Sequence, residues 1–271
     1  MNNLHVFEKD YNAEEYKHQD IKDLLYRLGD GFFTSKLLFA DLIRNMYIII
    51  TIYNRYNHRN SPISWLDICS GESITYRMFI NSFKEFKIDY NAIDMRLDVL
   101  QKLAEKYQEA SFYQGDAIKI IKQFDKNKHF EVITSIEGPE HLGKDGMKEF
   151  FKIANEKLNI GGILIFATPK KRDNGTLQHP ICHDFEMTID DIKTELINNN
   201  FKINNIYGYR IKTRIEDDDG EYYIEDVLSQ DEMKLFEKFN KFINYRLLLP
   251  MFVMNHPEKA TNLIFNCVKE K

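Results

Sequence analysis

Short apolar segments alternate with amphipathic segments along most of this chain. From Ile63 onward, a compact apolar run is repeatedly followed by a longer stretch whose apolar residues recur at helical spacing. Runs of the first kind are typical of buried strands, and stretches of the second kind are typical of helices that cross from one strand to the next. The pattern therefore predicts an α/β fold built on a mostly parallel sheet.

The predicted sheet has seven strands, and its last strand is expected to run antiparallel because it forms a hairpin with the strand before it. The expected strands are Ser64–Ile68, Lys87–Asp94, Ala110–Gln114, Phe130–Ser135, Gly162–Ala167, Lys202–Tyr209 and Asn262–Lys269. The expected helices are Ser73–Phe86, Arg96–Tyr107, Ala117–Phe124, Lys144–Leu158 and Thr188–Asn198.

Two parts of the chain lie outside this alternating pattern. Residues 1–60 are expected to form an N-terminal helical cap, with helices over Ala13–Leu28 and Thr34–Tyr56. Residues 61–271 are expected to form the α/β domain, with an insert at 212–260 before its last strand. The sequence thus predicts one main domain with two additions.

Composition indicates a soluble, reduced protein. With a net charge of −5, the chain as a whole does not attract the phosphate backbone of a nucleic acid. Its three cysteines, Cys69, Cys182 and Cys267, form no CxxC pair, which indicates reduced thiols and a cytoplasmic location. The start of the chain lacks a secretory signal pattern, and the apolar stretch Met46–Tyr53 is too short to cross a bilayer. No membrane association is expected.

Acidic residues accompany the ends of the first three predicted strands. Asp67 precedes the small-residue turn Cys69–Ser73, Asp94 ends the second strand, and Asp116 follows the third. The carboxyl ends of parallel strands lie at one edge of the sheet, where open α/β folds bind their cofactors. These residues therefore predict a cofactor site at that edge.

This ordered series of motifs resembles the class I S-adenosylmethionine-dependent methyltransferases, which have a Rossmann-like fold. The resemblance covers roughly residues 63–269. In that family an acid is followed by alternating glycines, and these glycine positions hold Cys69, Gly71 and Ser73 here. The resemblance implies S-adenosyl-L-methionine as the cofactor.

The resemblance also assigns roles to individual residues. Asp94 is expected to accept hydrogen bonds from both ribose hydroxyls, and Met95 and Arg96 are expected near the adenine or ribose. Asp116 is expected to accept a hydrogen bond from the adenine amino group. Ser135 would lie beside the methionine part. The implied cofactor-binding residues are Asp67, Cys69, Gly71, Asp94, Met95, Asp116, Ala117 and Ser135.

Each of these residues also has a structural interpretation. Aspartate after a strand commonly caps the next helix, and Cys69 is expected to pack in the turn rather than to act as a nucleophile. Cysteine and serine can replace glycine where the backbone dihedrals are negative, although they narrow the approach of a cofactor. A dinucleotide enzyme is the rival interpretation, but it would need glycine in place of Ile74, and Asp67 would repel a pyrophosphate.

The segment after the fourth predicted strand carries two carboxylates and a histidine. Its ExxEH pattern, Glu137 to His141, resembles ubiquinone-type O-methyltransferases and small-RNA 3′-end 2′-O-methyltransferases. In those families this segment can hold a divalent ion. A later His-x-Phe-Glu sequence, which begins at His183, resembles the RNA-modifying group, where a histidine completes the metal site. The implied metal ligands are Glu137, Glu140, His141 and His183.

Carboxylate and imidazole groups are suitable ligands for Mg²⁺, Mn²⁺ or Zn²⁺, and a bound cation lowers the pKa of an acceptor hydroxyl. Without a metal, His141 would serve as a general base, so the implied catalytic residues are His141 and Glu140. The alternative is that Glu140 and His141 orient the following helix, while His183 lies in a loop.

These observations predict a methyltransferase that acts on a hydroxyl of a small-molecule or glycan-like acceptor. A metal-dependent RNA 2′-O-methyltransferase is an alternative, because the basic cluster Lys170–Arg172 could bind a phosphate. A catalytically inactive, cofactor-binding partner subunit is a third hypothesis, motivated by the non-glycine residues Cys69 and Ser73. The sequence favours no particular oligomeric state.

Overall fold

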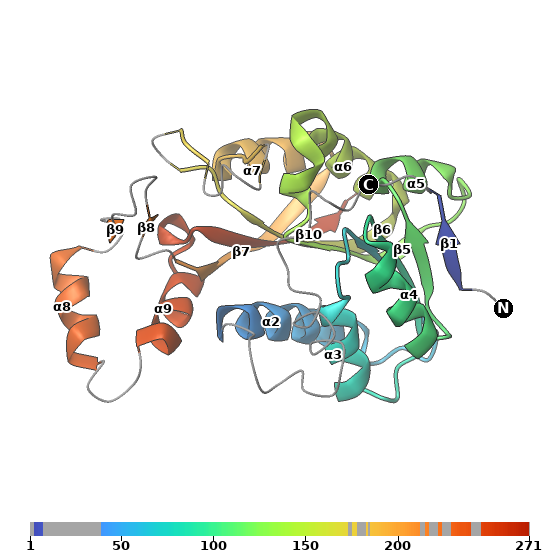
Figure 1. Cartoon of the computed structure of the whole chain (residues 1–271), viewed down its shortest axis with the longest axis horizontal. Helices are drawn as coiled ribbons and strands as arrows, with labels where there is room; N and C mark the ends of the chain where they lie inside the picture. Colours follow the sequence, from blue (N-terminus) through green and yellow to red (C-terminus); the bar gives the residue numbers. More distant parts are fainter. Residues whose placement is uncertain are drawn as a thin grey trace.

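The computed structural model describes residues 3–7, 39–172, 175–177, 183, 185–211, 215–216, 222–223, 229–239 and 245–270. Within these residues, helices cover both faces of one large sheet in three layers (Figure 1). The predicted α/β fold is therefore confirmed. The helix predicted over Ala13–Leu28 and the first part of the one predicted over Thr34–Tyr56 lie outside the described residues.

Eight strands form the central sheet, namely β1 (Leu4–Val6), β2 (Ile63–Ile68), β3 (Ile88–Asp94), β4 (Ser111–Gln114), β5 (Phe130–Ile136), β6 (Leu158–Pro169), β7 (Phe201–Arg210) and β10 (Asn262–Lys269). Their spatial order is β1-β4-β3-β2-β5-β6-β10-β7. Neighbouring strands are parallel, except that β10 runs antiparallel to both β6 and β7. The predicted parallel sheet with an antiparallel last strand is confirmed.

Six described helices form the outer layers, namely α2 (Phe39–Tyr56), α3 (Ile74–Ser82), α4 (Leu97–Lys106), α5 (Ala117–Gln123), α6 (Gly143–Lys157) and α7 (Ile189–Asn198). Helices α2, α3 and α4 cover one face, and α5, α6 and α7 cover the other (Figure 1). Helix α3 is shorter than predicted, because Phe83 leaves the helix and stacks on Tyr53 of α2, with ring centroids 4.4 Å apart.

Strand β1 is an eighth strand that the sequence pattern does not predict. It pairs in parallel with β4, with Leu4 opposite Phe112. The sheet therefore has one strand more than the seven predicted, and Leu4–Val6, within the predicted helical cap, is a strand. A strand this short shows no alternation, and its anchor is a side chain: the amide of Asn3 donates hydrogen bonds to the backbone carbonyls of Ala104, Tyr107 and Ala110.

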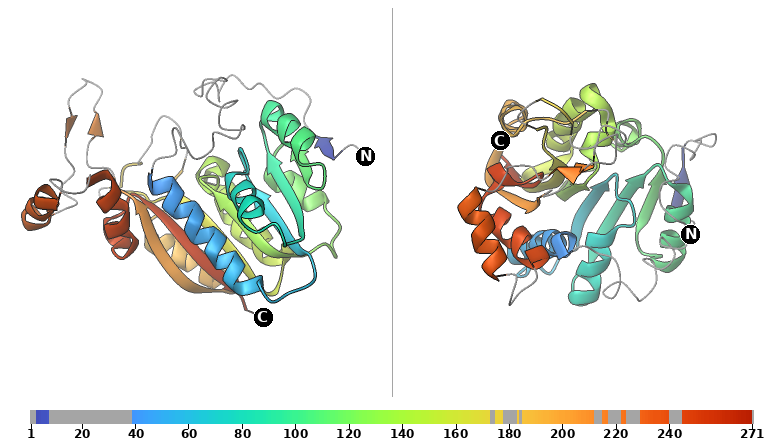
Figure 2. Two further views of the ribbon diagram at one scale, coloured as in Figure 1. Left: turned by 90° about the horizontal axis from the view of Figure 1, so that it is seen from below. Right: turned by 60° about the vertical axis from the view of Figure 1, so that its left-hand side comes forward.

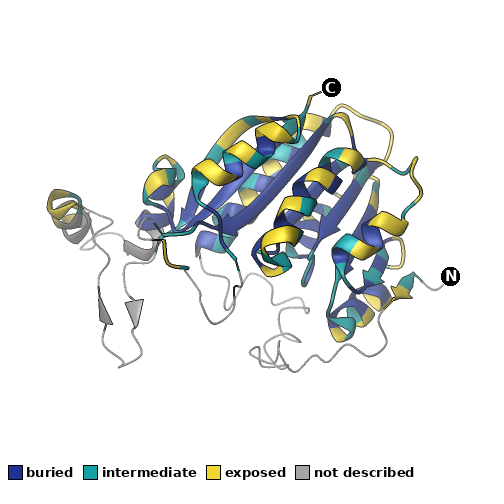
Figure 3. Ribbon diagram, turned by 90° about the horizontal axis from the view of Figure 1, so that it is seen from above, coloured by how far each residue is buried: buried dark blue, intermediate teal, exposed yellow. Residues whose placement is uncertain are grey.

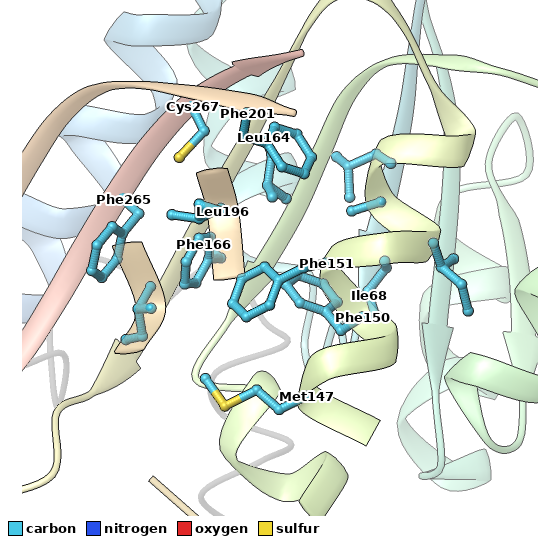
Figure 4. Packing of buried hydrophobic residues seen from close by; sticks show 14 of the residues in the cluster. Ile68, Met147, Phe150, Phe151, Leu164, Phe166, Leu196, Phe201, Phe265 and Cys267 are labelled. Carbon is cyan, nitrogen blue, oxygen red and sulfur yellow. The ribbon is translucent and has the colours of Figure 1, made fainter. Parts of the chain in front are cut away.

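The hydrophobic core fills both spaces between the sheet and its helices (Figure 3). Successive strand residues point to opposite faces, so in β2 Trp65 packs toward α3 while Leu66 packs toward α6. On the α6 side, Phe166 stacks on Phe265 with ring centroids 4.9 Å apart, and Phe151 packs edge-on against Phe166 (Figure 4). This packing fixes the strand ends that carry the site.

The segment between β7 and β10 contains β8 (Ile215–Glu216), β9 (Tyr222–Tyr223), α8 (Gln230–Phe239), α9 (Tyr245–Met254) and a 3₁₀ turn, Pro257–Lys259. These elements extend past the β7 edge of the sheet (Figure 2), and α9 contacts β7 and α2. They fall within the predicted insert at 212–260. In the part of the chain that the structure describes, no helix is long and apolar enough to cross a membrane.

Candidate active site

The turn after β2 has a left-handed backbone at three alternating positions. The φ angles are +55° at Cys69, +53° at Gly71 and +50° at Ser73. Glycine adopts this conformation freely, whereas a residue with a Cβ atom is strained there by roughly 1–2 kcal/mol. The negative dihedrals that would let Cys69 and Ser73 replace glycine without cost are therefore absent. Strain of this kind clusters at functional sites.

Asp94 at the end of β3 holds this turn against the neighbouring strand. Its Oδ2 accepts a hydrogen bond of 2.7 Å from the backbone N–H of Gly71, and its Oδ1 accepts one of 2.9 Å from the N–H of Arg96. The backbone carbonyl of Met95 accepts a 3.1 Å hydrogen bond from the buried side chain of Gln114. The predicted residues Gly71, Asp94 and Met95 thus lie together at the carboxyl edge.

Asp67 is buried beneath this edge and faces the protein interior. Its Oδ1 accepts a 2.7 Å hydrogen bond from the hydroxyl of Thr134, and its Oδ2 accepts a 2.6 Å hydrogen bond from the hydroxyl of Tyr90. Burial raises the pKa of Asp67 to about 6, although the two hydrogen bonds oppose that shift. Both oxygens of Asp67 therefore have structural hydrogen-bond partners, and its role toward a cofactor stays a prediction.

Asp116 and Cys69 have the structural roles expected as alternatives to ligand binding or catalysis, namely helix capping and packing in the turn. The carboxylate of Asp116 caps α5 by accepting a 3.0 Å hydrogen bond from the N–H of Lys119, and Ala117 is the first residue of that helix. Burial and nearby carboxylates, Asp94 first among them, raise the pKa of the Cys69 thiol well above its ordinary value. A thiol held neutral in this way packs in the turn and is not a nucleophile.

A cluster of one carboxylate and two imidazoles lies after β5. Ligand atoms of Glu140, His141 and His183 all lie within 4.8 Å of one another. Glu140 is in the 3₁₀ turn η3 (Pro139–Leu142) and is fully buried. Its Oε2 accepts a 3.0 Å hydrogen bond from Thr168, whereas its Oε1 is buried with no hydrogen-bond partner. Burial, with a contribution from Glu137, raises the pKa of Glu140 well above its ordinary range.

The orientation of His183 is fixed by a buried acid. The Nδ1 atom of His183 lies 2.7 Å from Oε1 of Glu186, whose side chain is fully buried. His141 and His183 meet edge-on, with ring centroids 5.1 Å apart. A histidine that ligates a metal commonly donates its other ring N–H to a carboxylate in this manner. Glu186 ends the His-x-Phe-Glu sequence, but the sequence analysis assigns it no role.

Glu137 does not join this cluster, contrary to the predicted ExxEH ligand set. Its φ angle is +53°, and its carboxylate turns toward β7 and β10. There it accepts hydrogen bonds from the hydroxyl of Tyr209 and, at 2.9 Å, from the side-chain amide of Asn262. Three of the four predicted metal ligands are therefore brought together, and the fourth is bound elsewhere.

Gly138 lets the turn after β5 approach the turn after β2. A Cβ atom on Gly138 would lie 2.6 Å from the Cβ of Cys69 and 2.7 Å from Oγ of Ser135, which are overlapping distances. The hydroxyl of Ser135 is itself buried without a hydrogen-bond partner. The predicted cofactor turn and the acid–histidine cluster therefore belong to one continuous edge.

A depression and a basic cluster are two further features of the described surface. A depression of about 770 Å³ lies at the opposite edge of the sheet, between the end of α3 and the start of β3, and the residues that line it include no histidine. The basic cluster Lys170–Arg172 is not fully exposed, because Lys170 is buried and its Nζ donates a hydrogen bond to the backbone carbonyl of Glu258. The chemistry therefore concentrates at the carboxyl edge.

No protein-family model and no curated protein matches the sequence. Solved structures match its fold. A protein from Galdieria sulphuraria, described provisionally as a sarcosine dimethylglycine methyltransferase, is 9% identical, with a TM-score of 0.57 over 93% of this chain and 99% of that one. The plantazolicin methyltransferase BpumL, solved with a desmethylPZN analogue and SAH, is 13% identical, with a TM-score of 0.53 over 96% of this chain and 94% of that one.

The [4+2]-cyclase SpnF is also similar, at 10% identity and a TM-score of 0.53 over 92% of each chain. Because a cyclase shares this architecture, the fold alone does not specify the reaction. These matches extend over nearly the whole chain. This chain has the fold of the class I S-adenosylmethionine-dependent methyltransferases.

Proposed function

We propose that this protein transfers a methyl group from S-adenosyl-L-methionine to a hydroxyl of a polar small-molecule or glycan-like acceptor. The observation that carries the proposal is the cluster of Glu140, His141 and His183 beside the strained turn after β2. A hydroxyl is a weak nucleophile, and a carboxylate–imidazole group is the chemistry that activates one. The fold supplies the context for the methyl donor.

The residues around the turn fit an adenosyl cofactor. The left-handed backbone at Cys69, Gly71 and Ser73 supports close approach of a ligand to the edge of the sheet. Asp94 offers a carboxylate for the ribose, and the buried, unpartnered hydroxyl of Ser135 is available to the methionine part. Asp116 would accept a hydrogen bond from the adenine amino group while it also caps α5.

The acid–histidine cluster fits a divalent cation. Oε1 of Glu140 is a buried acceptor without a partner, which is costly unless a ligand satisfies it. One carboxylate oxygen and two imidazole nitrogens suit Mn²⁺ or Zn²⁺ well, and Mg²⁺ less well. Such a cation, when bound, supplies Lewis acidity that lowers the pKa of an acceptor hydroxyl. Glu186 would keep His183 in the tautomer that binds it.

The chain itself contributes positioning and a route for the proton. The acceptor oxygen attacks the methyl carbon, the carbon–sulfur bond breaks, and its electron pair neutralises the sulfonium. The hydroxyl proton must then leave, and His141, which is exposed, is the base best placed to take it to solvent when its nitrogen holds no cation. Much of the rate would come from in-line alignment of the two substrates.

The proposal is tested by release of S-adenosylhomocysteine from S-adenosylmethionine across a panel of sugars, polyols and phenols, with and without Mn²⁺. We expect turnover that His183→Ala reduces at least tenfold and that exhaustive chelation abolishes. His256→Ala is the matched control, because His256 also lies beside a glutamate, Glu258, but on the insert, so its activity should equal that of the wild type. Turnover that is unchanged by chelation would exclude a cation from the proposed mechanism and leave His141 as the base.

RNA 2′-O-methylation is the second candidate, and the juxtaposition of His183 with Glu140 and His141 supports it. A ribo-oligonucleotide with a free terminal diol tests it when compared with the same oligonucleotide that carries a 2′-O-methyl group at that end. Methylation of the first substrate only would favour RNA. Cofactor binding without turnover on any acceptor would instead favour the inactive partner subunit, the hypothesis motivated by the non-glycine residues Cys69 and Ser73.

A further inference from the structure

Arg96 lies across the turn that the proposed cofactor must approach. Its backbone N–H and its side-chain Nε both donate hydrogen bonds to Oδ1 of Asp94, at 2.9 and 3.3 Å. A Cβ atom on Gly71 would lie only 3.0 Å from Nη2 of Arg96. The guanidinium therefore covers the one true glycine among the three left-handed positions of the turn.

The hydrogen-bonding capacity of Asp94 limits what else can bind there. A carboxylate offers about four acceptor sites, two on each oxygen. Oδ1 already accepts from both Arg96 groups, and Oδ2 accepts from the N–H of Gly71. About one site then remains, whereas a ribose that donates both of its hydroxyls needs two. The side chain of Arg96 occupies the acceptor site that the second hydroxyl requires.

The side chain of Arg96 is held weakly enough to be displaced. Its contact with Asp94 is a single 3.3 Å ion pair rather than a bidentate one, and 23% of the Arg96 side chain is exposed. The backbone N–H of Arg96 keeps its own bond to Asp94 when the side chain leaves, so the end of β3 stays in place. Swinging the guanidinium toward solvent would uncover Gly71 and free one acceptor site in a single movement.

We infer that Arg96 is a latch that determines ligand specificity at the cofactor site: it must be displaced from Asp94, and a ligand with an intact ribose diol is the kind that displaces it. The inference rests on the proposed cofactor and concerns selection among its analogues. Removal of the side chain should strengthen binding of diol ligands in particular. A ligand with one hydroxyl needs only the acceptor site that is already available, so it should gain less.

Isothermal titration with S-adenosylhomocysteine and its 2′-deoxy analogue tests the latch on the full-length protein. For Arg96→Ala we expect about three- to tenfold tighter binding of S-adenosylhomocysteine and less than a twofold change for the 2′-deoxy analogue. In the wild type, higher ionic strength should tighten binding of S-adenosylhomocysteine, because salt weakens the competing ion pair. That salt dependence should disappear in Arg96→Ala.

Arg59→Ala is the matched control, since Arg59 also pairs with a carboxylate, Glu131, but at the opposite edge of the sheet. Its affinities should equal those of the wild type. Weaker or unchanged binding of S-adenosylhomocysteine by Arg96→Ala, or equal gains for both ligands, would overturn the latch while leaving the proposed function intact. If neither the wild type nor Arg96→Ala binds either ligand, the proposed function fails, and the latch fails with it.

Discussion

At the scale of single residues, Asp67 couples folding to pH. Because burial raises its pKa from 3.8 to about 6, the folded state binds a proton in a range where the unfolded state does not. The stability that Asp67 contributes is therefore full below pH 3.8 and is lost as the pH rises through about 6. Asp67→Asn keeps the shape of the side chain and cannot ionise.

We expect the difference in unfolding free energy between wild type and Asp67→Asn to change by on the order of 2 kcal/mol between pH 4 and pH 6.5. The wild type should become less stable relative to the variant as the pH rises. Urea denaturation across this range measures it. Two parallel stability profiles would contradict the assigned environment of Asp67, in which Tyr90 and Thr134 bind its oxygens.

Ser73 provides a second test at the same scale. Its φ of +50° strains a serine but not a glycine, so Ser73→Gly should stabilise the protein by roughly 0.5–1 kcal/mol, after the greater flexibility of glycine in the unfolded chain is deducted. Ser82→Gly makes the same change at the last residue of helix α3, which has no positive φ, and should destabilise the protein. Chemical denaturation that shows the same sign for both variants would reject strain at Ser73.

At the scale of elements, the site depends on contact between two turns. The Cβ atom introduced by Gly138→Ala would overlap the Cβ of Cys69, so we expect a loss of about 1–3 kcal/mol in unfolding free energy. Cys69→Gly removes the Cβ atom of Cys69, so the double variant should recover part of that loss. A double-mutant cycle measures the coupling, and purely additive effects would show that the turns do not meet as described.

At the scale of the whole molecule, the sequence predicts most of the sheet because its strands are apolar runs buried on both faces. Phe130–Ile136 and Asn262–Lys269 are examples, each buried along nearly its whole length. Leu4–Val6 has no such pattern, since it is an edge strand with exposed residues, and its position depends on Asn3. The antiparallel direction of the last strand follows from the hairpin predicted for it.

The site was predictable only where sequence order alone determines position. Asp94 lies at the carboxyl edge of the sheet because it ends a strand, and this holds whatever surrounds it. Glu137 turns away from the cluster of Glu140, His141 and His183 because its carboxylate binds Tyr209 and Asn262, which are 72 and 125 residues further along the chain. No spacing rule reports partners that only tertiary pairing brings together. For the same reason, the sequence does not predict the hydrogen bond that Thr168 donates to Glu140.

Because the two proposed ligands use separate side chains on one edge, each should stabilise the whole fold by mass action. S-adenosylhomocysteine at about 100 times its Kd should add roughly 2.7 kcal/mol to the unfolding free energy, or about 5–10 °C in the melting temperature. Asp94→Ala should lose this shift and keep the one caused by Mn²⁺, whereas His183→Ala should do the reverse. Thermal melts of the three proteins with each ligand test this, and a full S-adenosylhomocysteine shift in Asp94→Ala would exclude Asp94 from the cofactor site.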